Sequence, residues 1–135
     1  MKFNFGFIEE GKNLKRLQES INSGCSIVFY AENKASMNHF KSLLLELTEV
    51  RDLQVCYVTS IKNDSVFSLK NKNIFAYYIG DGITRTKFFL TLKAKILIMD
   101  MPDLETFHIK RSKVYPVHYI YIFHSMFSIH SYLRK

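Results

Sequence analysis

The hydrophobic residues of this chain fall into short continuous runs, separated by segments in which apolar residues recur at helical spacing. Runs that are rich in β-branched and aromatic residues, and that lack polar alternation, are typical of strands covered on both faces, as in a parallel sheet. The order of strand, helix and strand also favours right-handed parallel crossovers. We therefore predict a mainly parallel sheet of about five strands, formed by residues 26–30, 53–59, 74–79, 95–99 and 117–123.

Helical periodicity is clearest in three segments. In the first, Leu14, Leu17 and Ile21 share one face, and Gly24 follows at the position where a left-handed C-cap residue is favoured. The predicted helices cover residues 14–22, 35–50 and 84–93, and weaker helical content occurs in residues 61–73 and 126–133.

The amino-terminal segment has a different pattern. Residues 3–8 alternate phenylalanine with Asn4 and Gly6, which leaves a short strand and a docking arm as alternatives. We expect an amino-terminal arm and amphipathic helix in residues 1–24, followed by a Rossmann-like unit in residues 25–135. The predicted fold class is α/β, a three-layer Rossmann-like half-domain.

The composition agrees with a folded domain. A chain of 135 residues has the size of one domain, and 47% hydrophobic residues are typical of a globular protein. No run of roughly 18 apolar residues occurs, so no membrane-spanning helix is expected. Cys25 and Cys56 are too few for a zinc cluster, and we predict buried free thiols outside an oxidising compartment.

The formal net charge of +7 favours an anionic partner, such as a phosphate-rich substrate, an anionic membrane or nucleic acid. The lysines are scattered rather than clustered, so an ordinary solvated surface explains the charge equally well. Binding to nucleic acid rests on charge alone, because no stacking motif or recognition helix is identifiable, and we do not expect it.

Gly80 and Gly82 flank a turn between the predicted strand 74–79 and the helix that follows. Glycines at such a turn let the backbone approach a phosphate, and helix amides favour an anion there. Arg85 stands where a dinucleotide fingerprint has its third glycine, which weakens a nucleotide interpretation. A tight turn is the alternative role, although Arg85 and Lys87 add positive charge for an anion.

His124 follows the last predicted strand, at the sheet edge where ligands of parallel sheets bind. An imidazole there can act as a general base near neutral pH, and a capped histidine under the next helix is the alternative. His118 shares its strand face but lies roughly 20 Å away along an extended strand. The two imidazoles therefore cannot share a metal ion, and we predict no metal site.

Charged residues also follow the strand at residues 95–99. Asp100 and Asp103 suit an acid pair or, although we predict no metal site, the seat of a metal ion. Carboxylates at strand ends also cap helices and form loops. Lys110, Arg111 and Lys113 suit a phosphate, and a solvated loop accounts for them equally well.

Several segments resemble the amino-terminal half of CDP-glycerol glycerophosphotransferase-like proteins, a family that includes teichoic-acid and capsule polymerases of bacterial envelopes. The most specific are M-P-D-L at residues 101–104, H-I-K-R-S at residues 108–112 and V-H-Y-I-Y-I-F-H-S at residues 117–125. The similarity extends over roughly residues 26–135 and includes the Y-I-G-D-G turn at residues 78–82.

This resemblance implies a GT-B architecture, in which an amino-terminal half holds the acceptor and a second half holds the CDP-linked donor. The acceptor hydroxyl would attack the β-phosphate of CDP-glycerol and release CMP, with no cofactor. His124 looks like the histidine that ends the corresponding strand, which implies a catalytic base. We predict substrate contacts from Gly80, Gly82, Arg85, Asp103, Lys110, Arg111 and Ser125.

The donor half of such enzymes would lie beyond Lys135, so we expect a fragment that is inactive alone and meets CDP-glycerol only with that half. The expected partner is a polyol-phosphate or glycan acceptor. A cytoplasmic location with peripheral contact at the inner face of the membrane follows from lipid-linked acceptors and from the positive charge. The alternative is a non-catalytic α/β module that recognises an anionic partner.

Overall fold

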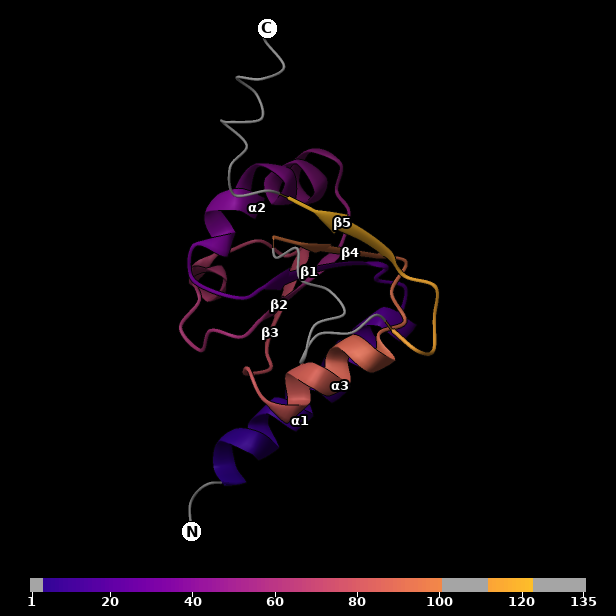
Figure 1. The fold of residues 1–135 in the computed structure, drawn as a ribbon. Helices are drawn as coiled ribbons and strands as arrows, with labels where there is room; N and C mark the ends of the chain where they lie inside the picture. The colour runs from indigo at the N-terminus through magenta and orange to yellow at the C-terminus, as the bar shows by residue number, and fades with distance from the viewer. Residues whose placement is uncertain (1–3, 101–111, 123–135) are drawn as a thin grey trace, which may run out of the picture.

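The computed structural model describes residues 4–100 and 112–122, which form an α/β fold around an all-parallel sheet (Figure 1). The five strands stand in the order β3-β2-β1-β4-β5, so the predicted fold class is confirmed. Each pair is parallel, with Val28 of β1 opposite both Cys56 of β2 and Leu97 of β4. The strands are β1 (Ile27–Ala31), β2 (Val55–Thr59), β3 (Ile74–Tyr78), β4 (Ile96–Met99) and β5 (His118–Tyr121).

Three α-helices cover the two faces of this sheet. Figure 1 shows α1 (Asn4–Asn22) and α3 (Ile83–Thr91) on one face and α2 (Ser36–Leu45) on the other. The side chains between α1, α3 and the sheet form one hydrophobic cluster, and those between α2 and the sheet form a second. Strands buried between two helical layers explain why their sequences are nearly continuous apolar runs.

The amino-terminal segment is helical, and the strand alternative for residues 4–8 is wrong. α1 is continuous from Asn4, and Phe7 on it is 52% exposed. Further along the helix, Leu14 and Leu17 are buried in the same cluster as the core of the sheet. The buried leucines anchor the helix. Extending an existing helix by one residue costs less free energy than nucleating a new helix.

The helix predicted for residues 35–50 has the expected extent but changes its geometry. After Leu45 it continues as a π-helical turn, Glu46–Val50, in which the buried Thr48 hydroxyl donates to the Leu44 carbonyl over 2.8 Å. The Asn73 amide donates to the Thr48 carbonyl over 2.9 Å, which ties this turn to the residue before β3. The connection from β2 to β3 contains only a 3-10 turn, Ser65–Ser68.

None of the helices in the described part of the chain has the length and apolar content that a membrane crossing requires.

Candidate functional site

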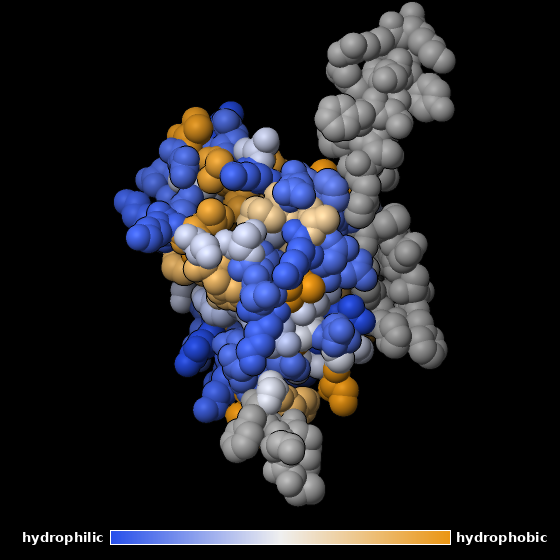
Figure 2. Space-filling view, turned by 90° about the vertical axis from the view of Figure 1, so that its left-hand side faces the viewer, coloured by the Kyte–Doolittle hydropathy of each residue, from blue (hydrophilic) through white to orange (hydrophobic). Residues whose placement is uncertain are grey.

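The strand order places a topological switch point between β1 and β4. The chain builds β2 and β3 on one side of β1, then crosses back to build β4 and β5 on the other. In open parallel sheets, ligands bind outside the carboxyl ends of the strands at such a point. Figure 2 looks toward this edge of the sheet and shows a mainly hydrophilic surface with smaller apolar patches. The switch point is therefore our candidate site.

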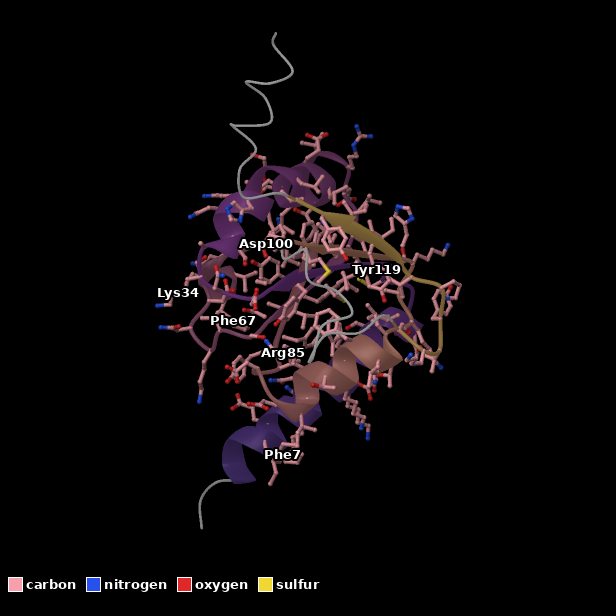
Figure 3. The ribbon with its side chains drawn as sticks, in the orientation of Figure 1. Phe7, Lys34, Phe67, Arg85, Asp100 and Tyr119 are labelled. Atoms are coloured by element: carbon pink, nitrogen blue, oxygen red, sulfur yellow. The ribbon has the colours of Figure 1, made fainter. Side chains whose placement is uncertain are left out.

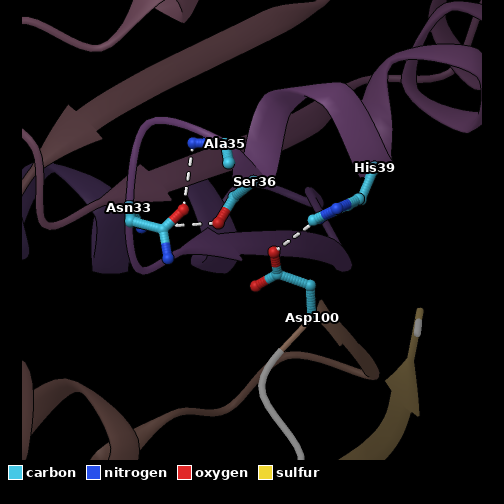
Figure 4. A network of polar contacts seen from close by, with 5 residues as sticks. All are labelled: Asn33, Ala35, Ser36, His39 and Asp100. Atoms are coloured by element: carbon cyan, nitrogen blue, oxygen red, sulfur yellow. Dashed lines mark hydrogen bonds and ion pairs between the residues drawn. The ribbon is translucent and has the colours of Figure 1, made fainter. Parts of the chain in front are cut away.

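An ion pair joins the two elements that leave the switch point (Figure 4). Asp100 follows β4 and His39 lies in the first turn of α2, and His39 Nδ1 is 2.9 Å from Asp100 Oδ2. The Asp100 side chain is 1% exposed, whereas that of His39 is 21% exposed. A buried carboxylate is costly unless it is paired and hydrogen-bonded. The pair therefore fixes the start of α2 against the end of β4.

The turn between β1 and α2 is held by its own hydrogen bonds. Asn33 Oδ1 accepts from the Ala35 amide over 2.9 Å, and the Asn33 amide donates to the buried Ser36 hydroxyl over 3.4 Å (Figure 4). Short side chains that bond to nearby backbone groups in this way stabilise turns. Hydrogen bonds within the chain thus hold the turn beside His39.

A second polar group lies at the carboxyl ends of the strands on the face of α1 and α3. The Tyr30 hydroxyl is 2.5 Å from Ser60 Oγ, which donates to the Gly80 carbonyl over 2.6 Å. Burial raises the pKa of Tyr30, and contacts with Ser60 and the Arg85 guanidinium oppose this rise. Figure 3 shows Arg85 on α3 and Asp100 beyond β4, on the same side of the molecule.

Arg85 has an unsatisfied donor at this edge. Its Nε atom is buried and has no hydrogen-bond partner in the structure of the described residues. Buried polar groups are normally paired, and an unpaired one calls for an explanation such as a missing ion or ligand. A guanidinium binds phosphate and carboxylate through several N–H groups at once. Arg85 is therefore the described residue best suited to an anionic ligand.

The glycine turn before α3 is close to a carboxylate of the chain itself. Gly80 has a φ of +74°, and a Cβ atom at this position would lie 2.4 Å from Glu10 Oε2. Burial raises the pKa of Glu10, as does nearby Asp81, while hydrogen bonds from Thr84 and Tyr78 oppose the rise. Glu10 of α1 thus lies against the residue that was expected to face a phosphate.

Gly82 differs from Gly80 in its surroundings. It is the N-cap residue of α3, and a Cβ atom there would meet nothing within 4 Å. Of the two glycines, only Gly82 therefore has open space beside it for a ligand.

A buried hydroxyl lies on the α2 face of the sheet, in β2. Tyr57 is fully buried, and its hydroxyl has no hydrogen-bond partner in the structure of the described residues. Burial raises the pKa of Tyr57 far above its usual value, and the carboxylates of Asp64 and Asp100 raise it further. Tyr57 on the α2 face of the sheet and Arg85 on the α3 face therefore each carry a donor without a partner among the described residues.

The structure brings together some of the residues expected from the sequence. Gly80, Gly82 and Arg85 belong to one turn and the helix that follows it. Sequence reasoning missed His39, Tyr30 and Ser60, although the first turn of a helix after a strand was a place to look for a ligand contact. The predicted base His124 and the predicted contacts Asp103, Lys110, Arg111 and Ser125 lie outside the described residues.

Comparisons of this chain with protein-family models, with curated proteins and with solved structures found no match. The fold and the site together define a Rossmann-like α/β half-domain with a polar switch point.

Proposed function

We propose that this chain is the acceptor-side half-domain of a CDP-glycerol-dependent glycerophosphotransferase. The observation that carries the proposal is the buried Nε of Arg85, which has no hydrogen-bond partner among the described residues and lies at the same sheet edge as the His39–Asp100 pair. A polyol-phosphate acceptor offers both a phosphate for a guanidinium and hydroxyl groups for polar side chains. The Rossmann-like strand order supports a ligand at this edge.

In the proposed reaction, an acceptor hydroxyl forms a bond to the β-phosphorus of CDP-glycerol. The bond from that phosphorus to the bridging oxygen of CMP breaks, CMP leaves, and a base takes the hydroxyl proton. His124, which resembles the family histidine, stays the proposed base. We assign His39 and Asp100 a positioning role, because their contact holds the end of β4 against α2. Asp103, Lys110 and Arg111, which we predicted as substrate contacts, follow Asp100 in the sequence.

Binding of glycerol 3-phosphate to the chain tests the acceptor site. We expect NMR titration to perturb the amides around Arg85, Asn33 and Asp100, at the carboxyl ends of the strands. Arg85→Gln should weaken binding roughly tenfold or more, the loss expected for a charge-assisted hydrogen bond. Lys87→Gln removes the same charge from an exposed position on α3 and should change binding by less than about twofold. Equal losses in both variants would contradict a specific role of Arg85.

Measurement of CMP release tests whether this chain holds only the acceptor. The described residues form one Rossmann-like unit, and the proposed chemistry needs a second unit to hold the donor. We therefore expect the chain to release no CMP when mixed with CDP-glycerol and glycerol 3-phosphate. CMP release that depends on the acceptor would show that this chain holds both substrates.

The net charge of +7 supports a second candidate, a non-catalytic module that binds an anionic partner. Such a module would recognise charge without the polyol. Inorganic phosphate that binds as tightly as glycerol 3-phosphate, at the same amides, would favour this candidate. Clearly weaker binding of inorganic phosphate would favour the acceptor site.

A further inference from the structure

Two cysteine thiols meet inside the molecule, away from the candidate site. Cys25 lies in the short connection between α1 and β1, Cys56 lies in β2, and both are buried free thiols, as predicted. The sulfur atoms are 3.1 Å apart, and the Cys56 thiol is placed to donate to Cys25 Sγ. Two thiols so close together need little movement to form a covalent bond.

We propose that Cys25 and Cys56 are a reversible redox pair, which hydrogen peroxide converts into an intramolecular disulfide. The two thiols differ in access. Cys25 lines a cavity of about 340 Å³ together with Ser20, Gln54 and Tyr77, whereas Cys56 is fully buried and does not line it. A small oxidant can therefore reach Cys25 first. Cys25 is the attacking sulfur and Cys56 is the resolving one.

The electrostatics of the pair agree with this order. The hydrogen bond from Cys56 lowers the pKa of Cys25, although burial opposes the effect. The same bond raises the pKa of Cys56, and burial raises it further. Because the thiolate is the reactive form of cysteine, the negative charge develops on the sulfur that borders the cavity.

The reaction has two balanced steps. The Cys25 thiolate attacks one oxygen of the peroxide, the O–O bond breaks, and the hydroxide that leaves takes a proton to become water. Cys25 is then a sulfenic acid. The sulfur of Cys56 attacks Cys25 Sγ, the S–O bond breaks, and the Cys56 proton leaves with the hydroxyl as a second water. Peroxide has been reduced by two electrons and the thiols oxidised by two.

The disulfide would tie the connection between α1 and β1 to β2, closing a loop across 31 positions of sequence. Such a cross-link limits the unfolded chain and stabilises the folded state when its geometry is relaxed. In a reducing compartment, disulfides are usually transient and redox-sensing rather than permanent. A thiol reductant should therefore restore the pair.

Intact-mass measurement on the full chain tests the proposal. After peroxide and removal of excess oxidant, we expect a monomer lighter by about 2 Da with no free thiol, and dithiothreitol should reverse the change. The melting temperature should rise by roughly 5–10 °C on oxidation. Cys56→Ala should stop at the sulfenic acid, about 16 Da heavier and trapped by dimedone. Cys25→Ala should leave Cys56 unmodified.

Circular dichroism tests whether each alanine variant folds. If a variant does not fold, the mass change of the unmodified chain still tests the proposal. Two free thiols that survive peroxide at a concentration that oxidises N-acetylcysteine would overturn the proposal. Disulfide-linked dimers without the intramolecular bond would overturn it as well. A Cys25→Ala variant in which Cys56 reacts readily would refute the order of the two sulfurs.

Discussion

Two buried tyrosines in neighbouring strands differ in how their hydroxyls are satisfied. Tyr30 of β1 and Tyr57 of β2 are both fully buried, but only the Tyr30 hydroxyl has a hydrogen-bond partner, Ser60, among the described residues. A buried hydroxyl without a partner loses its hydration and gains nothing in return, whereas a paired one contributes to stability. Removal of the hydroxyl should therefore change the free energy of unfolding in opposite directions at the two positions.

We expect Tyr57→Phe to raise the free energy of unfolding by about 1 kcal/mol and Tyr30→Phe to lower it by about 1 kcal/mol. Urea denaturation of both variants measures this difference, and each variant is the matched control of the other. A loss of stability in Tyr57→Phe equal to that in Tyr30→Phe would contradict the unsatisfied state of the hydroxyl. If the hydroxyl is kept for a ligand, Tyr57→Phe should also weaken binding of glycerol 3-phosphate while it stabilises the fold.

The elements of the fold were largely predictable from the sequence, because burial of each strand imposes a local pattern. All five strands overlap the predicted runs, with ends that differ by at most two residues; β1, for example, begins at Ile27 rather than at residue 26. The alternation of phenylalanine in residues 3–8 was misleading. A segment of six residues spans only about one and a half turns of helix, which is too short for alternation to distinguish a strand from a helix.

The contacts that build the site could not be predicted in the same way. His39 and Asp100 are 61 positions apart in sequence, and only the sheet order brings them together. Glu10 likewise meets Gly80 because α1 lies beside the end of β3. A pattern read along the chain carries local periodicity, whereas these pairs depend on how the elements pack. Arg85 was identified because its position in a helix after a glycine turn is itself a local signal.

The contact between α1 and the turn before α3 should depend on pH through Glu10. The folded-state pKa of Glu10 is raised, so its contribution to stability is fully present below the unfolded pKa and is lost as pH rises through the folded value. At neutral pH the ionised carboxylate therefore destabilises the fold. We expect Glu10→Gln to be more stable than the unmodified chain at pH 7, with a difference that shrinks as pH falls through the folded-state pKa and disappears below the unfolded value of 4.5.

Denaturation at several pH values measures this effect. Glu19→Gln, at an exposed position of the same helix, is the control and should show no comparable gain at pH 7. A gain in Glu10→Gln that stays the same at low pH would have to come from packing rather than from ionisation.

At the scale of the whole molecule, two hydrophobic clusters share one sheet. Leu17 of α1 is buried in the cluster on one face, and Phe40 of α2 is buried in the cluster on the other. Each strand contributes alternate side chains to the two clusters, so loss of either layer exposes apolar surface of the same strands. The amino-terminal helix should therefore unfold together with the sheet, although its sequence alone suggested a separate arm.

Native-state hydrogen exchange can decide whether the molecule is one cooperative unit. Leu17→Ala should lower the free energy of unfolding by about 2–4 kcal/mol, because it leaves a cavity under α1. In a cooperative unit, exchange protection should fall by the same amount for amides of α1, of β2 and of α2 on the opposite face. Ile8→Ala, at a 48% exposed position of α1, should change stability by less than about 0.5 kcal/mol. If Leu17→Ala releases the amides of α1 while those of β2 keep their protection, the helix is a separate unit.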